Sequence, residues 1–167
     1  MVDAYAEERS SEIGEVGSDC RIVGARFIRE VRIGNGVEID GASILENATL
    51  CDGARVGVDV KAYDLIAAEG SVIDNGSIVE RCFVGESCRL DKGFTAAESL
   101  FFANSHCENG EAASIFAGPY TVSHHKSSLL IAGMFSFFNA GSGSNQSNHL
   151  FKSGAVHQSV HLRGCKF

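Results

Sequence analysis

Apolar residues recur at every sixth position along much of the first 95 residues. One series ends at Leu90, and every sixth residue before it is apolar back to residue 60. An earlier series has the same step of six. A third series precedes that one, shifted by one residue relative to it. A period of six matches neither an α-helix, with 3.6 residues per turn, nor an isolated strand, which alternates at two. The pattern therefore predicts short strands stacked on one another. The three series are Val60, Ile66, Val72, Ile78, Val84 and Leu90; Ile33, Ile39, Leu45 and Cys51; and Val16, Ile22 and Ile28.

The best repeats are in IGNGVEIDGASILENATLCDGA, residues 33–54. This segment resembles the hexapeptide-repeat family, in which an aliphatic residue is followed by Gly or an acid and a small residue precedes the next aliphatic. The resemblance implies an all-β fold, a left-handed parallel β-helix with about 18 residues per coil. In such a prism each aliphatic side chain points inward, and Gly or Asn occupies the corners. The flat faces of related prisms pack threefold, so the resemblance also implies a homotrimer.

The repeat divides the chain into four parts. Residues 1–15 are predicted to be an N-terminal extension, and residues 16–95 the regular β-helix. The period fails over residues 96–119, which hold the only proline, and we expect an irregular insertion there that leaves the helix as a loop. Residues 120–167 are rich in Ser, Asn and His and predict irregular polar coils. Because a solenoid needs a cap and none follows, we expect a C-terminal truncation.

Charge is distributed unevenly along the chain. The net charge is −7, yet all 21 Asp and Glu residues lie at or before Glu111, and five of the six histidines follow it. This balance argues against a nucleic-acid partner but suits a small anionic or sugar-nucleotide ligand. No basic head with an apolar stretch opens the chain and no apolar run could cross a bilayer, so we expect a cytoplasmic protein with no membrane partner. The six scattered cysteines predict reduced, mostly buried thiols.

The last 48 residues resemble a second family, an uncharacterised bacterial one described as related to UDP-N-acetylglucosamine pyrophosphorylases. The runs SHHKSSLLIAG and FNAGSGSNQSNH carry this resemblance. It implies that the chain is part of a larger, sugar-nucleotide-related protein. Pyrophosphorylase chemistry itself is not expected here, because no recognisable signature supplies the magnesium-binding carboxylates and the phosphate-binding loop.

The leading functional hypothesis is acyl transfer. Hexapeptide-repeat acyltransferases, as the resemblance implies, use a histidine to deprotonate a sugar or sugar-nucleotide acceptor that attacks acetyl-coenzyme A between subunits. For that base we select His149 or His125, with Lys126 placed to meet a phosphate. Asn145 and Asn148 would orient the acceptor or the imidazole. The alternative is a structural or oligomerisation module without chemistry, whose polar residues form corners and ladders.

A third hypothesis is a zinc-dependent, hydratase-like trimer. His157 and His161 would share one face of a strand, and the resemblance implies zinc sites built from three histidines in some related trimers. The gap of four differs from the gap of five in that pattern, so no metal is expected. His106 and His124 are eighteen apart and would stack in an uninterrupted coil, but Pro119 between them argues against such a coil.

Overall fold

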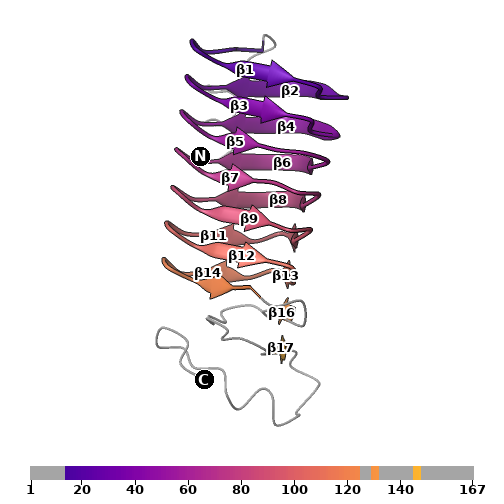
Figure 1. Cartoon of the computed structure of the whole chain (residues 1–167). Coiled ribbons are helices and arrows are strands. Elements are labelled where there is room, and N and C mark those ends of the chain that lie inside the picture. Colours follow the sequence, from indigo (N-terminus) through magenta and orange to yellow (C-terminus); the bar gives the residue numbers. More distant parts are fainter. Residues whose placement is uncertain (1–13, 125–128, 132–144, 148–167) are drawn as a thin grey trace, which may run out of the picture.

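The computed structural model describes residues 14–124, 129–131 and 145–147. They form a parallel β-solenoid of about six turns, in which each coil lies on the one before it (Figure 1). The predicted all-β solenoid is thereby confirmed. The described residues contain no helix, and so none that is long and apolar enough to span a membrane.

Two parallel sheets run the length of the stack. The seven-stranded sheet contains β1 (Arg21–Val23), β3 (Glu38–Asp40), β5 (Arg55–Val56), β7 (Val72–Ile73), β9 (Arg89–Asp91), β12 (His106–Glu108) and β15 (Val122–Ser123). The second sheet contains β2 (Ile28–Ile33), β4 (Ile44–Leu50), β6 (Lys61–Ala67), β8 (Ile78–Val84), β10 (Thr95–Ala97), β13 (Glu111–Ala113), β16 (Leu129–Ile131) and β17 (Asn145–Ser147). Two further strands, β11 (Leu100–Phe101) and β14 (Phe116–Ala117), continue the second halves of its long strands.

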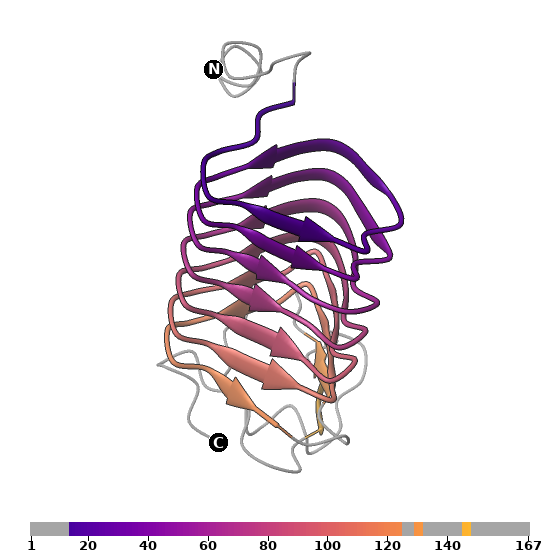
Figure 2. The ribbon, with the colours of Figure 1, turned by 45° about the horizontal axis from the view of Figure 1, so that its top comes forward.

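Residues with positive φ turn the chain at three places in each coil, which gives the coil three sides (Figure 2). One corner lies inside or just after the strands of the second sheet and is occupied by Glu30, Asn47, Asp64, Arg81, Glu98 and Ser114. Another is occupied by Asp19, Gly36, Gly53, Gly70, Ser87, Asn104 and Tyr120. Glycine adopts this left-handed conformation without steric cost, and Asn and Asp tolerate it better than most residues. The predicted use of Gly and Asn at corners is confirmed in part: of the 21 positive-φ residues in the described part of the chain, seven are Gly and four are Asn.

Consecutive coils are in register at an interval of 17 residues over most of the stack, not the expected 18. Ile44 pairs with Lys61 and Lys61 with Ile78. Buried positions accordingly recur at intervals of six, six and five, and a strict step of six drifts off the interior by one residue in each coil. This series begins Ile33, Ile39, Leu45, Leu50, Val56, Ala62, Ala67, Ile73, Val79, Val84 and Leu90, and every member is at most 3% exposed.

Several sequence assignments to the interior are therefore wrong. Ile66 and Ile78 are 49% and 38% exposed, because their neighbours Ala67 and Val79 occupy the buried positions. A one-residue slip moves a strand side chain to the opposite face. Val16, Ile22 and Ile28 are exposed for a different reason: they pair with the buried Ile33, Ile39 and Leu45, as the step of six predicts, but they belong to the first described coil, which no other described coil covers. Val60, Val84 and Leu90 are fully buried, as predicted.

The predicted loop excursion over residues 96–119 is also wrong. This segment continues the solenoid, since β10 pairs with β8 and β13, and β11 pairs with β8 and β14. The irregularity lies in coil length: Thr95 pairs with Glu111 at an interval of 16. Pro119 does not interrupt the coil, because it lies at an exposed turn beside Tyr120, which has a φ of 62°.

The described cysteines are all free. Cys82, Cys88 and Cys107 point into the core and are at most 5% exposed, while Cys20 and Cys51 are half-buried. Burial raises the pKa of the Cys107 thiol to about 12. Core thiols at Cys82 and Cys88 confirm the sequence interpretation.

Candidate functional site

The residues selected for acyl transfer fall at the C-terminal end of the chain. Asn145 begins β17, which pairs in parallel with β16, with Asn145 opposite Leu129. The others, His125, Lys126, Asn148 and His149, lie outside the described residues, as do His157 and His161. Their roles stay predictions. The described residues do contain a different group of polar side chains, on the outer surface of the seven-stranded sheet.

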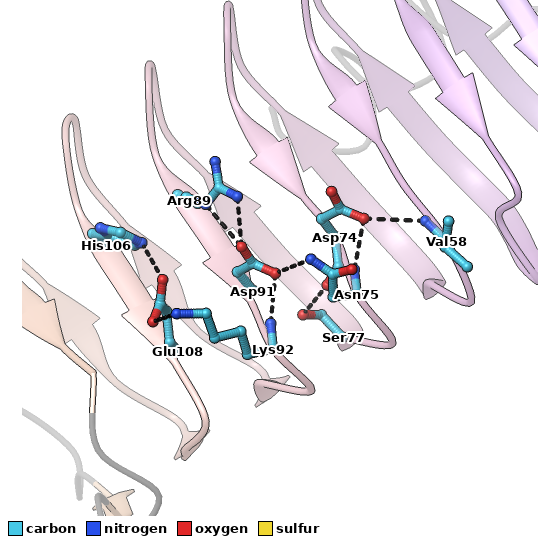
Figure 3. A network of polar contacts seen from close by, with 9 residues as sticks. All are labelled: Val58, Asp74, Asn75, Ser77, Arg89, Asp91, Lys92, His106 and Glu108. Carbon is cyan, nitrogen blue, oxygen red and sulfur yellow. Dashed lines mark hydrogen bonds and ion pairs between the residues drawn. The ribbon is translucent and has the colours of Figure 1, made fainter.

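On this surface, carboxylates and their partners link neighbouring coils (Figure 3). Asp74 accepts hydrogen bonds from the backbone N–H groups of Val58 on the previous coil, at 3.1 Å, and of Asn75, at 2.7 Å. The Asn75 side chain in turn donates to Asp91 on the next coil, at 2.7 Å. Side chains one coil apart thus satisfy one another, as polar groups at a packed surface must.

Asp91 is the most enclosed carboxylate of this ladder, at 2% exposed. Arg89 donates to its Oδ2 atom at 2.6 Å and 2.9 Å, and the Lys92 N–H donates to Oδ1 at 2.6 Å. Burial by itself raises the pKa of Asp91, but the hydrogen bonds from Asn75, Arg89 and Lys92 outweigh it and lower the pKa below its usual value. Asp91 is therefore an ionised, fully engaged structural group.

One coil further along, Glu108 lies between a lysine and a histidine. Its Oε2 atom accepts a hydrogen bond from Lys92 Nζ at 2.5 Å, and its Oε1 atom lies 2.9 Å from His106 Nε2. The hydrogen bond from Lys92 is the main cause of a lowered Glu108 pKa, with His106 contributing in the same direction. A carboxylate beside one imidazole nitrogen fixes the orientation of the ring, which suits either a general base or a metal ligand.

His124, immediately after β15, completes this group. Its ring meets that of His106 edge-on, with ring centroids 4.3 Å apart, and its backbone oxygen accepts a hydrogen bond from the Asn109 side chain at 3.2 Å. The two histidines therefore do stack on adjacent coils, and the objection drawn from Pro119 was wrong. We call His106, Glu108 and His124 the histidine cluster.

Glu108 and Lys92 were not among the residues predicted from the sequence. The predicted candidates lie in or next to the acid-free segment, and Glu108 lies just before that segment begins. The available signal was the pair His106 and Glu108, two apart in a strand and therefore on one face. Lys92 could not have been placed without the 17-residue register, which puts it one coil away from Glu108.

A second surface feature is apolar. It lies on the second halves of β6 and β8 and on β11 and β14, which continue them. Each of these strands has one outward apolar side chain in the same register: Ile66, Phe83, Leu100 and Phe116. Phe102 lies beside this row. Ile66 and Leu100 are 49% and 40% exposed, and the three phenylalanines are half-buried. The Phe102 ring lies 6.0 Å from that of Phe83 and 4.5 Å from that of Phe116. We call these five residues the apolar face.

Comparison with known proteins gives a family but no activity. No curated protein matches the chain. The family model that matches covers residues 1–167 and is described as "Domain of unknown function (DUF4954)". No hexapeptide-repeat family model matches, so that resemblance is borne out only as far as the parallel β-solenoid. Because the match spans the full sequence, the chain belongs to the DUF4954 family.

Proposed function

We propose that this domain is an assembly module: a rigid β-solenoid that joins copies of the chain to one another through the apolar face, as a trimer. The observation that carries the proposal is the row of apolar side chains, one from each coil, from Ile66 to Phe116. Soluble monomers rarely expose large contiguous apolar patches, and such patches are typical of protein contacts. Trimeric packing follows the resemblance to hexapeptide-repeat prisms.

Charge favours the same surface for self-association. Two copies of a chain with a net charge of −7 repel each other. The electrostatic cost of contact is smallest where the contacting surface of each copy carries no charged side chain. The outer surface of the seven-stranded sheet carries ion pairs between Arg21 and Asp40 and between Arg89 and Asp91. The apolar face has no charged member.

The geometry favours a second copy of the chain over an unrelated partner. Residues of the apolar face recur at the spacing of the coils, about 4.8 Å, because parallel strands stack at that distance. A partner with the same spacing can match it coil by coil. A symmetric homo-oligomer supplies such a partner without any additional component.

Substitution of one isoleucine on each of two faces tests the proposal. Ile66→Arg places a charge in the apolar face, whereas Ile78→Arg, at a similarly exposed position on the first half of β8, places the same charge outside it. Light scattering should give an oligomer for the wild type and for Ile78→Arg and a monomer for Ile66→Arg. Oligomers of equal mass for both variants would contradict the role of this face.

Acetyl-coenzyme A-dependent transfer to a sugar or sugar-nucleotide acceptor is our second proposal, and it rests on the resemblance and the solenoid architecture. Assembly is a precondition for it, since the predicted cleft lies between subunits. Titration of acetyl-coenzyme A into the assembled protein tests cofactor binding, and an acetyl-transfer assay of the His149→Ala and His125→Ala variants tests the base. Unchanged transfer in both variants would remove these histidines as bases.

A further inference from the structure

The histidine cluster brings together three groups that commonly bind transition metals. The side chains of His106, Glu108 and His124 each offer one ligand atom, and these atoms all lie within 4.8 Å of one another. Two imidazoles and one carboxylate form a frequent ligand set of zinc sites that retain an open position. Borderline ions such as Zn²⁺ and Co²⁺ prefer these donors, whereas Mg²⁺ and Ca²⁺ prefer oxygen alone.

The backbone fixes where these groups lie. His106 and Glu108 are two apart on β12 and project to the same side of the sheet. Because Cys107 pairs with Ser123 in parallel register, the next residue, His124, lies beside Glu108. The hydrogen bond from Asn109 to the His124 backbone oxygen holds the chain there after β15 ends. Two adjacent coils thus set the ligand positions before any ion binds.

The distances suit a tetrahedral ion. Ligand atoms about 2.0–2.2 Å from zinc in tetrahedral geometry are about 3.3–3.6 Å from one another. The separation of 2.9 Å between His106 Nε2 and Glu108 Oε1 lies below this range, and the upper limit of 4.8 Å for the cluster lies above it. Coordination replaces the hydrogen bond between His106 Nε2 and Glu108 Oε1, because a metal-bound imidazole nitrogen carries no proton.

Solvent can reach the cluster from one side. His124 is exposed, the His106 side chain is 34% exposed and that of Glu108 is 10% exposed. An ion can therefore enter from solution and keep at least one position for water. Within the described residues the His124 ring makes no hydrogen bond, so its coordination of an ion breaks none of the bonds among them.

From this arrangement we propose that His106, Glu108 and His124 bind a divalent transition metal of the zinc type, with an open coordination position. The site is contained in one chain and lies on the seven-stranded sheet, away from the apolar face, so it does not depend on assembly. Lys92 acts beside the ligands: its ammonium holds Glu108 Oε2, leaves Oε1 for the ion, and competes with the ion for the carboxylate.

The test is calorimetric titration of Zn²⁺ into the tag-free chain of residues 1–167, together with visible absorption of the Co²⁺ complex. We expect one site in the wild type. Glu108→Gln and His124→Ala should weaken binding at least about 100-fold, since even changes to residues that only support ligands cost 10- to 100-fold. Lys92→Gln should instead tighten binding, because it removes a competing cation.

Glu98→Gln is the matched control. It removes a carboxylate that pairs with Arg81 at 3.0 Å, outside the cluster, and should leave Zn²⁺ affinity unchanged. Each variant is checked for folding by circular dichroism without metal. Failure of the wild type to bind, or equal affinity in Glu108→Gln and His124→Ala, would overturn the proposal, as would a Co²⁺ spectrum showing thiolate ligation.

Discussion

Truncation of Phe101 measures the interior of the solenoid directly. The Phe101 side chain is fully buried, and its ring meets that of Phe94 edge-on at 6.0 Å and 77°. Substitution of a buried phenylalanine by alanine lowers the free energy of unfolding by about 3–5 kcal/mol. Of this, about 0.5–1.5 kcal/mol belongs to the ring pair itself. In a double-mutant cycle with Phe94→Ala, the two single costs should therefore sum to more than the cost of the double variant, by the energy of the ring pair.

Phe102→Ala is the matched control, because Phe102 is the next residue and faces outward. It is half-buried, and we expect its truncation to cost about 1 kcal/mol. Both changes are made in the Ile66→Arg background, so that assembly does not contribute to stability. Urea denaturation followed by far-ultraviolet circular dichroism gives the two costs. Equal losses of unfolding free energy for Phe101→Ala and Phe102→Ala would refute the conclusion that Phe101 faces the core and Phe102 faces outward.

Three further predictions concern other parts of the fold. Gly85→Ala should destabilise the protein by about 1–3 kcal/mol in the same denaturation assay, since the new Cβ atom would lie 2.7 Å from the Phe101 backbone oxygen; a neutral result would show that the coils can separate there. Hydrogen bonds from the Asn35 backbone and side chain lower the pKa of Asp52, so their stabilisation is present above its unfolded pKa of about 3.9 and is lost as pH falls through the folded value. Asp52→Asn should therefore lose less stability than the wild type between about pH 5 and pH 2, and parallel pH curves would contradict this. Cys107, with a pKa raised to about 12 by burial, should react with a thiol reagent only after denaturation, and mass-spectrometric detection of labelled Cys107 in the folded protein would show that the core opens.

The sequence was sufficient for the architecture because the hexads encode it locally. Ile33, Ile39 and Leu45 follow the step of six and are all buried. The step then shortens to five at Leu50, and this change is invisible to a strict period because Cys51, one residue later, is also compatible with a core. The series counted back from Leu90 meets the same shortening after Val84, which puts Ile78 and Ile66 one residue away from the buried Val79 and Ala67 and so on the wrong face.

The candidate site was harder to predict for a different reason. The histidine cluster forms only because β12 and β15 are 16 residues apart in register, one fewer than in the regular coils. Loss of the hexad pattern after residue 95 suggested a loop, although small buried residues such as Ala96 and Ala112 still filled the interior. Apolar periodicity therefore reports the core less well where alanine replaces larger side chains.

The mass of the wild-type chain in solution tests the central proposal, self-assembly through the apolar face, most directly. Light scattering over a dilution series should give three times 17.7 kDa, and high salt should not dissociate the assembly because the contact is apolar. A mass of 17.7 kDa for the folded chain throughout the series would contradict the proposal.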